Sequence, residues 1–196
     1  MVNNEDTNRN NIFLMDQTAN PAPLGLCAFG TTTILLSLWN AGVIGISSPI
    51  IAMAIFYGGL AQIIAGLMEW KKNNNFGFLT FVSFGFFWMT FAGVFILPAF
   101  GLAKAPGPAD LAAFLTVWGI VAFGLLICTL NMHRSLQVTV LAVFLTIALL
   151  VAAELTESGL VKLGAGLMGI LAGALAIYIG LGQVINEIHG RKIIPV

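Results

Sequence analysis

The chain of 196 residues is 59% hydrophobic and only 8% charged, whereas ordinary globular domains carry roughly 25% charged residues. Its eight basic and eight acidic residues cancel at pH 7, so nothing in the charge indicates a nucleic-acid partner. This composition excludes an ordinary water-soluble domain and indicates that lipid is the solvent.

Long uncharged stretches indicate the membrane spans. Residues 17–68 carry no formal charge, and this stretch is too long for one crossing, which takes about 20 apolar residues. Gly42, Gly45 and Pro49 interrupt it near its middle, so it divides into two helices. Further uncharged stretches follow at residues 73–103, 111–132, 135–153 and 163–186. The sequence therefore predicts an all-α integral membrane protein with six transmembrane helices, at residues 24–43, 49–70, 76–98, 109–131, 135–153 and 161–188.

The charges between these helices predict their orientation. We expect a polar N-terminal tail at residues 1–19, a six-helix membrane domain at 20–190 and a short C-terminal tail at 191–196. The N-terminal tail lacks the basic region and the cleavage site of a signal peptide, so we expect the first helix to be retained. Basic residues gather on one side of the predicted domain, at Arg9, Lys71, Lys72, Arg134, Arg191 and Lys192, against Lys104 and Lys162 on the other. The positive-inside rule then predicts a multi-pass protein of the cell membrane, surrounded by lipid, with both termini in the cytoplasm.

Polar residues recur on one face of the first predicted helix. Phe29, Thr33, Ser37 and Asn40 follow one another at spacings of four, four and three residues, which puts them on one face. Hydroxyl and amide groups of this kind join neighbouring helices in some membrane proteins and line solute paths in others. Helix packing and pore lining therefore both remain open from the sequence.

Small residues form similar stripes on two other helices. In the second helix Gly58, Gln62, Gly66 and Glu69 share a face. The stripe of the last helix consists of Gly169, Gly173, Ala176, Gly180, Gln183 and Glu187. Such stripes are more often seams between helices than pore walls, so the glycines predict close helix packing. The polar residues at the end of the last stripe are better placed for a vestibule.

Ionisable side chains fall at the ends of the predicted spans rather than in their middle. Glu69 and Glu187 are examples. For each of them two roles are open: it accepts a proton from a substrate, or it marks the membrane interface. A small solute stabilised by hydroxyls, amides and helix N-termini fits this pattern better than a large polyanion.

The sequence lacks the residue patterns of an enzyme or a metal site. Cys27 and Cys128 stand in apolar context without a CxxC spacing, which is typical of small buried hydrophobic residues. His133 and His189 have no partner at a metal-ligand spacing. We therefore predict no catalysis, no metal and no cofactor.

The first helix opens with a heptapeptide that resembles a family signature. Residues 20–26 read NPAPLGL, which is similar to the signature of the acetate uptake transporter family. That family includes bacterial succinate–acetate permeases and fungal acetate and ammonia exporters. The resemblance extends over residues 18–196. It is also carried by residues 52–62 with Glu69, by Phe76-Gly77 and Trp88, and by Asn186-Glu187 with Gly190-Arg191 and Pro195.

The resemblance implies a function and a set of site residues. It implies a homohexamer in which each protomer has its own path for acetate and related small monocarboxylates, with succinate as a further candidate. A narrow apolar constriction would interrupt this path at Phe29, Phe84 and Val143. Bacterial permeases have Tyr and Leu at the last two of these positions, so this chain lacks the hydroxyl and has a smaller side chain at Val143. The candidate substrate-binding residues are Asn20, Gly25, Thr33, Ser37, Asn40, Tyr57, Gln62, Glu69, Gln183 and Asn186.

Other functions remain as alternatives. Residues 20–22 form an Asn-Pro-Ala tripeptide like that of aquaporins, but an aquaporin needs two such motifs meeting in mid-membrane and this chain has one. A channel for another small neutral or weak-acid solute, such as ammonia or water, fits the same apolar helices. A membrane sensor that transports nothing is also open, because signalling needs no motif.

Overall fold

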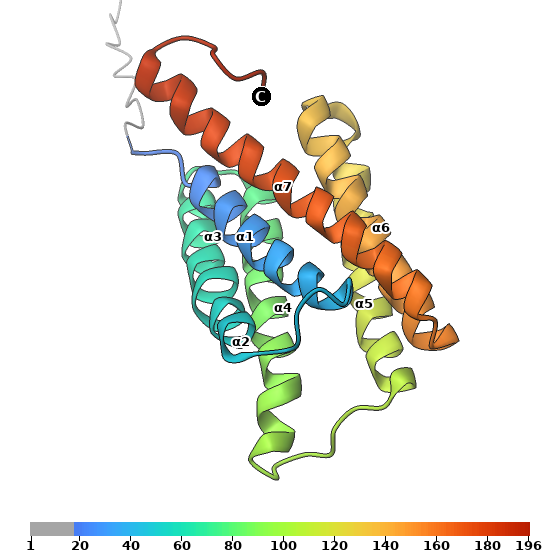
Figure 1. Ribbon diagram of the computed structural model, residues 1–196. Coiled ribbons are helices and arrows are strands. Elements are labelled where there is room, and N and C mark those ends of the chain that lie inside the picture. Colours follow the sequence, from blue (N-terminus) through green and yellow to red (C-terminus); the bar gives the residue numbers. More distant parts are fainter. Residues whose placement is uncertain (1–17) are drawn as a thin grey trace, which may run out of the picture.

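The computed structural model describes residues 18–196, and all the regular elements of this part of the chain are helical. Six helical segments are long and apolar enough to cross a membrane, which confirms the predicted all-α fold with six spans. Most of the predicted N-terminal tail, with Arg9, lies outside the described residues. Five of the spans are single α-helices: α1 (Ala22–Asn40), α4 (Asn75–Ala99), α5 (Pro108–Cys128), α6 (Arg134–Thr156) and α7 (Gly159–His189) (Figure 1).

The second span contains a π-helical segment that the sequence analysis did not predict. This span runs from α2 (Ser48–Ile55) through η1 (Phe56–Ala61), the π segment, into α3 (Gln62–Lys71). Gly58 and Gly59 within η1 are both buried, and a Cβ atom on Gly58 would lie 2.7 Å from Thr32 Cγ2. Such wide turns occur frequently at functional sites. Here the wide turn directly precedes Gln62, whose side chain lines a cavity in the bundle.

The helix ends lie within three residues of the predicted ones. The first helix ends at Asn40 rather than at residue 43, because Gly42 has a φ of 75°, a left-handed conformation that glycine adopts without strain. The last helix ends at His189, and Gly190, which follows directly with a φ of 60°, caps it. A short 3₁₀ turn, η2 (Thr129–Asn131), extends the fourth span.

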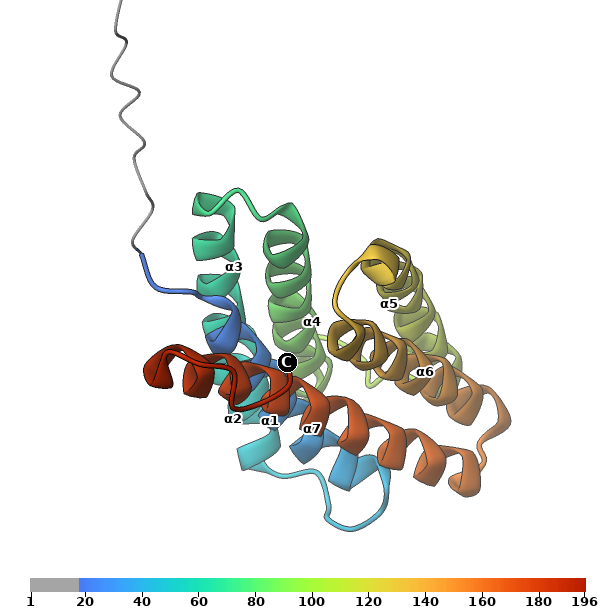
Figure 2. The same ribbon diagram turned by 90° about the horizontal axis from the view of Figure 1, so that it is seen from above.

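The six spans pack as neighbouring pairs. Helix α7 crosses α1, α3 lies beside α4, and α5 lies beside α6, which in turn contacts α7 (Figures 1 and 2). Aromatic rings bridge α4 and α5: Phe87 stacks on Phe114, with ring centroids 5.8 Å apart, and meets Trp118 edge-on at 5.2 Å. The side chains of α4, α5 and α6 around this aromatic cluster enclose part of the site described below.

The glycine stripe of α7 is a seam between helices, as predicted. A Cβ atom on Gly180 of the stripe would lie 3.0 Å from Cys27 Sγ, and one on Gly166, about one turn before the stripe, would lie 2.6 Å from the backbone nitrogen of Ala41. No side chain fits at Gly166 without moving the backbone of the opposite helix. Glycine at such positions lets the backbones of two membrane helices approach closely.

The first and last spans also meet at one end of the bundle. Asn20 Nδ2 donates a hydrogen bond to Gln183 Oε1 over 3.1 Å, which joins the start of α1 to the last turns of α7. We call this end, with the α3–α4 and α5–α6 connections, the terminal end. The opposite end, with the connections α1–α2, α4–α5 and α6–α7, is the far end (Figure 1).

Candidate functional site

A cavity of about 270 Å³ opens into the bundle at the terminal end. All six spans and residues near the α3–α4 and α5–α6 connections contribute to its wall, which is mostly apolar. Its polar lining residues include Gln62, Glu69, Thr80, Thr139 and Gln183. A mostly apolar cavity with a few polar groups is the usual form of a site for a small molecule.

A second, smaller cavity of about 40 Å³ lies closer to the far end. Its polar wall comes mainly from α1, through Thr33, Ser37 and Asn40, together with Thr146 of α6. All four of these side chains are buried. The face of the first helix that the sequence left open between packing and pore lining therefore borders a cavity.

Three residues line both cavities: Phe29 of α1, Phe84 of α4 and Val143 of α6. The two phenyl rings meet edge to face, with centroids 5.5 Å apart and an interplanar angle of 70°. All three side chains are buried, with at most 9% of their surface exposed. The two cavities therefore meet at one apolar ring contributed by three different spans.

Gln62 has an unpaired amide oxygen and lines the larger cavity. Its side chain is 1% exposed and lines the cavity, and its Oε1 has no hydrogen-bond partner. The π segment η1 ends immediately before it, so the wide turn sets the direction from which this side chain enters the bundle. A buried amide oxygen without a partner is costly, by about 1–3 kcal/mol. A ligand in the cavity that donates a hydrogen bond to this oxygen would recover the cost.

Glu69 lies deeper at the terminal end than its place near a helix end suggested. It is 3% exposed, and its Oε2 accepts a hydrogen bond of 2.8 Å from Asn74 Nδ2. Its Oε1 has no partner, and both residues line the larger cavity. Gly77 makes room for the carboxyl group, since a Cβ atom there would lie 2.9 Å from Glu69 Cδ. The carboxyl is thus part of the wall of the larger cavity.

The polar residues on α1 and just before it differ in which of their hydrogen-bonding groups are already used. Thr33 Oγ1 donates to the Phe29 carbonyl over 2.7 Å, so its hydroxyl proton is used within the helix. Asn20 Oδ1 accepts from the Ala22 nitrogen at 3.1 Å, while its amide nitrogen is bonded to Gln183. Asn20 therefore holds the start of α1 at the mouth of the larger cavity, of which Gln183 is a lining residue.

Four of the candidate binding residues line neither cavity: Asn20, Gly25, Tyr57 and Asn186. Gly25 packs beneath Phe81, where a Cβ atom would lie 2.6 Å from the ring. Tyr57 is half-buried within the π segment. The side chain of Asn186 is occupied by the C-terminal segment: its Oδ1 accepts from the nitrogens of Ile193 and Ile194, and its Nδ2 donates to the Ile194 carbonyl.

The sequence analysis missed a polar stripe on α6. Ser135, Thr139, Val143 and Thr146 recur at spacings of four, four and three, the spacing that singled out the face of α1. Ser135 and Thr139 line the larger cavity and Thr146 the smaller one. The same search applied to this helix would have found them. The sequence analysis also missed Thr80 of α4, whose buried hydroxyl has no partner and which lines the larger cavity.

Known proteins resemble this chain in both sequence and structure. The succinate-acetate/proton symporter SatP of Escherichia coli (strain K12) is 43% identical over 178 residues, which are 91% of this chain and 95% of that protein. A solved structure of the bacterial acetate channel SatP superimposes with a TM-score of 0.90 at 42% identity, and covers 92% of this chain and 99% of that one. The ammonia transport outward protein 2 of Saccharomyces cerevisiae is 37% identical over 82% of this chain and 59% of its own, longer sequence.

The family assignment follows from these similarities and from a match along almost the whole sequence. Residues 8–194 match the GPR1/FUN34/yaaH family. The match includes all six spans and every residue that lines the two cavities, except Val196. This chain is a multi-pass membrane protein that belongs to the GPR1/FUN34/yaaH family.

Proposed function

We propose that this protein carries acetate and related small monocarboxylates across the membrane, along a path through each protomer. The observation that carries the proposal is the meeting of two cavities at the single apolar ring of Phe29, Phe84 and Val143. The path runs from the larger cavity past this ring into the smaller one. The names of two relatives, a succinate-acetate/proton symporter and an acetate channel, support this class of substrate.

The chemistry of acetate fits such a path. A ring of Phe and Val side chains accepts the methyl group at little cost, since both are apolar. Moving the carboxylate out of water is expensive unless donors replace the water molecules. Gln62 on one side of the ring, and Ser37 and Asn40 on the other, are buried and supply polar groups there. Passage as neutral acetic acid lowers the barrier further.

The setting of this path is part of the proposal. Both termini face the cytoplasm of a cell membrane, because the connections at the terminal end carry Lys71, Lys72 and Arg134. Six protomers assemble, each with its own path and no catalytic activity. The outer surface supports assembly and contact with lipid, since large apolar side chains such as Val117, Ile120 and Leu181 are exposed on the single chain.

A channel for ammonia is the second candidate. The yeast relative named as an ammonia transport outward protein supports it, and a small neutral solute passes an apolar ring more easily than an anion does. The unpaired atoms in the larger cavity include Gln62 Oε1 and Glu69 Oε1, which accept hydrogen bonds, so they pair with ammonia or with the hydroxyl of neutral acetic acid and not with a carboxylate anion.

One experiment separates these candidates. Purified protein in liposomes is tested for entry of labelled acetate, with propionate and formate as competitors, and for ammonia entry through an internal pH dye. Acetate entry above that of empty liposomes, reduced by the competitors, is the expected result. Ammonia entry without acetate entry would favour the second candidate. Neither flux, in protein verified as folded, would leave the sensing alternative and reject transport of both solutes.

A further inference from the structure

We propose that Lys162 is a carboxylate-binding site at the far mouth of the path, and that Glu154 occupies this site as a tethered stand-in for the substrate. The proposal rests on the proposed function for its class of ligand. The head group of a glutamate side chain is chemically an acetate, so Lys162 accepts either one without any change in the type of contact.

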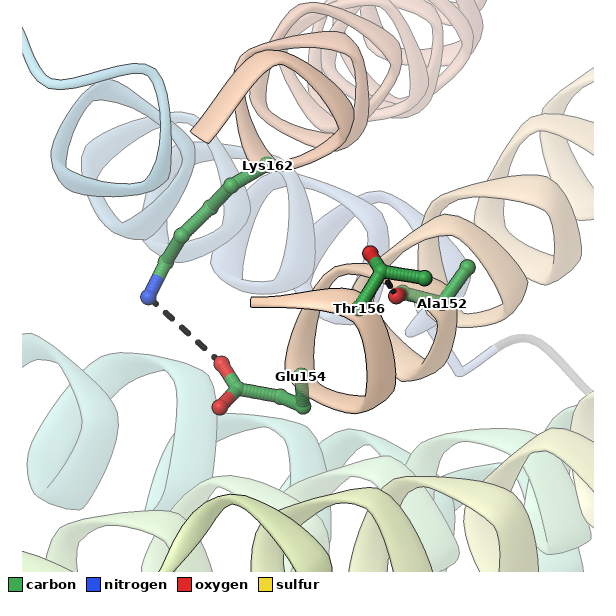
Figure 3. A network of polar contacts seen from close by, with 4 residues as sticks. All are labelled: Ala152, Glu154, Thr156 and Lys162. Carbon is green, nitrogen blue, oxygen red and sulfur yellow. Dashed lines mark hydrogen bonds and ion pairs between the residues drawn. The ribbon is translucent and has the colours of Figure 1, made fainter. Parts of the chain in front are cut away.

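The side chains of Lys162 and Glu154 come from different spans and meet near Trp39 of α1. Lys162 Nζ of α7 lies 3.5 Å from Glu154 Oε1 of α6 (Figure 3). The same ammonium group lies 4.9 Å from the ring centroid of Trp39 on α1. Neighbouring Thr156 bonds back to the carbonyl of Ala152 and leaves this pair alone (Figure 3). Lys162 is therefore held by one carboxylate and one aromatic ring.

This pair lies one helical turn beyond the smaller cavity. The α6 wall of that cavity ends at Leu150, and Glu154 follows four residues later, on the same face of the helix. On α1 the cavity wall ends at Asn40, next to Trp39. A solute that passes the apolar ring toward the far end therefore meets Lys162 and Glu154 as the next charged groups.

The ion pair is loose enough for another carboxylate to replace that of Glu154. Its 3.5 Å separation is longer than the roughly 2.7–2.9 Å of a strong charge-assisted hydrogen bond. Lys162 is 35% exposed and Glu154 16%, so water and small anions reach the ammonium group. An ammonium has three donors, and the contact with Trp39 keeps it in place when the Glu154 carboxylate swings away. An incoming monocarboxylate then replaces Glu154 against Lys162.

The test compares three single variants and one double variant for acetate entry into liposomes. Glu154→Gln removes the competing carboxylate, so the KM for acetate falls, by up to about fivefold for a partly exposed ion pair. Lys162→Gln removes the site and raises the KM by a similar factor. The double variant behaves like Lys162→Gln. Lys104→Gln, which changes an exposed basic residue in the α4–α5 connection at the same end, leaves the KM unchanged.

Two outcomes would overturn the site. If both Glu154→Gln and Lys162→Gln raised the maximal flux at unchanged KM, the pair would be a steric gate and no binding site. If neither changed any flux parameter, the pair would be structural.

A second readout does not depend on transport. Reductive methylation of lysines in the detergent-solubilised protein is followed by mass spectrometry, in sodium acetate or in sodium chloride of equal strength. Acetate is expected to protect Lys162 relative to Lys104, and to protect it at lower concentration in Glu154→Gln. Equal methylation of both lysines in the two salts would reject the site, even if acetate flux is found. Protection of Lys162 without acetate flux would keep the site and reject the proposed function.

Discussion

Gly30 on α1 and Gly173 on α7 pack so closely that a side chain on either one would collide with the backbone of the other. A Cβ atom on Gly30 would lie 2.5 Å from the carbonyl oxygen of Gly173, and one on Gly173 would lie 2.6 Å from the carbonyl oxygen of Gly30. Both obstacles are backbone atoms within helices, so neither moves without separating the spans. This contact holds together two walls of the path, since α1 supplies Phe29 and α7 supplies Ala176.

We expect Gly173→Ala to destabilise the protein by about 1–3 kcal/mol, the usual cost of overpacking. The measurement is thermal unfolding in detergent. Gly164→Ala is the matched control on the same helix, because a Cβ atom at Gly164 would meet nothing within 4 Å. There the substitution should leave the protein as stable or more so, since alanine favours a helix. Equal melting temperatures for the two variants would show that the α1–α7 seam tolerates a methyl group.

Val143→Phe should slow acetate entry strongly. The added ring fills the place where the two cavities meet, beside Phe29 and Phe84. The rate is measured in liposomes and normalised to folded protein, because a larger side chain in a packed region also costs stability. Val138→Phe on the same helix is the control, since Val138 is 49% exposed and lines neither cavity. Unchanged acetate entry in Val143→Phe would place the path elsewhere.

Phe29→Ala should widen the selectivity of the path toward larger monocarboxylates. Removing the ring widens the passage, so the ratio of lactate to acetate flux rises. The substitution also costs about 3–5 kcal/mol for a buried phenyl ring, and the ratio must be measured on protein that remains folded. If Phe29 is only a packing residue, stability falls and the ratio stays as it was. That result would reject the constriction without rejecting transport.

Gln62→Met separates a role in transport from a role in packing. The substitution keeps the length of the side chain and removes a buried amide whose oxygen has no partner. Stability should therefore stay the same or rise, while acetate flux falls by up to about tenfold, as expected for a lost hydrogen bond from neutral acetic acid to the amide oxygen. Gln137→Met is the contrasting control. Gln137 bonds the carbonyls of Leu130 and Met132 and lines neither cavity, so stability should fall with flux per folded protein unchanged.

Asn186→Ala should release the C-terminal segment from α7. The three hydrogen bonds of this amide hold residues 193 and 194, and Val196 beyond them lines the larger cavity. Trypsin should then cleave after Arg191 and Lys192 faster in detergent. Glu187→Ala, one residue along and exposed, serves as the control. Cleavage at the same rate in both variants would mean that packing against Gly182 holds the segment without the amide.

Particular residues explain how far the sequence alone determined this protein. The six spans followed from uncharged length, because lipid leaves a crossing chain few alternatives to a helix of about 20 residues. The α7 seam followed from glycine spacing, because residues three and four apart share a helix face whatever the neighbour is. The polar face of α1 was visible for the same reason, but its two interpretations were not separable, since spacing does not show what lies opposite.

Only the tertiary structure decided which faces enclose space. Asn186 and Gln183 are three residues apart on one helix, yet the first binds the C-terminal segment and the second lines a cavity. The pairing of Lys162 with Glu154 depends on how two consecutive helices pack, and the larger cavity depends on all six spans. Periodicity is a property of one helix by itself, whereas a cavity, an unpaired amide or an ion pair between spans exists only once several helices have packed together.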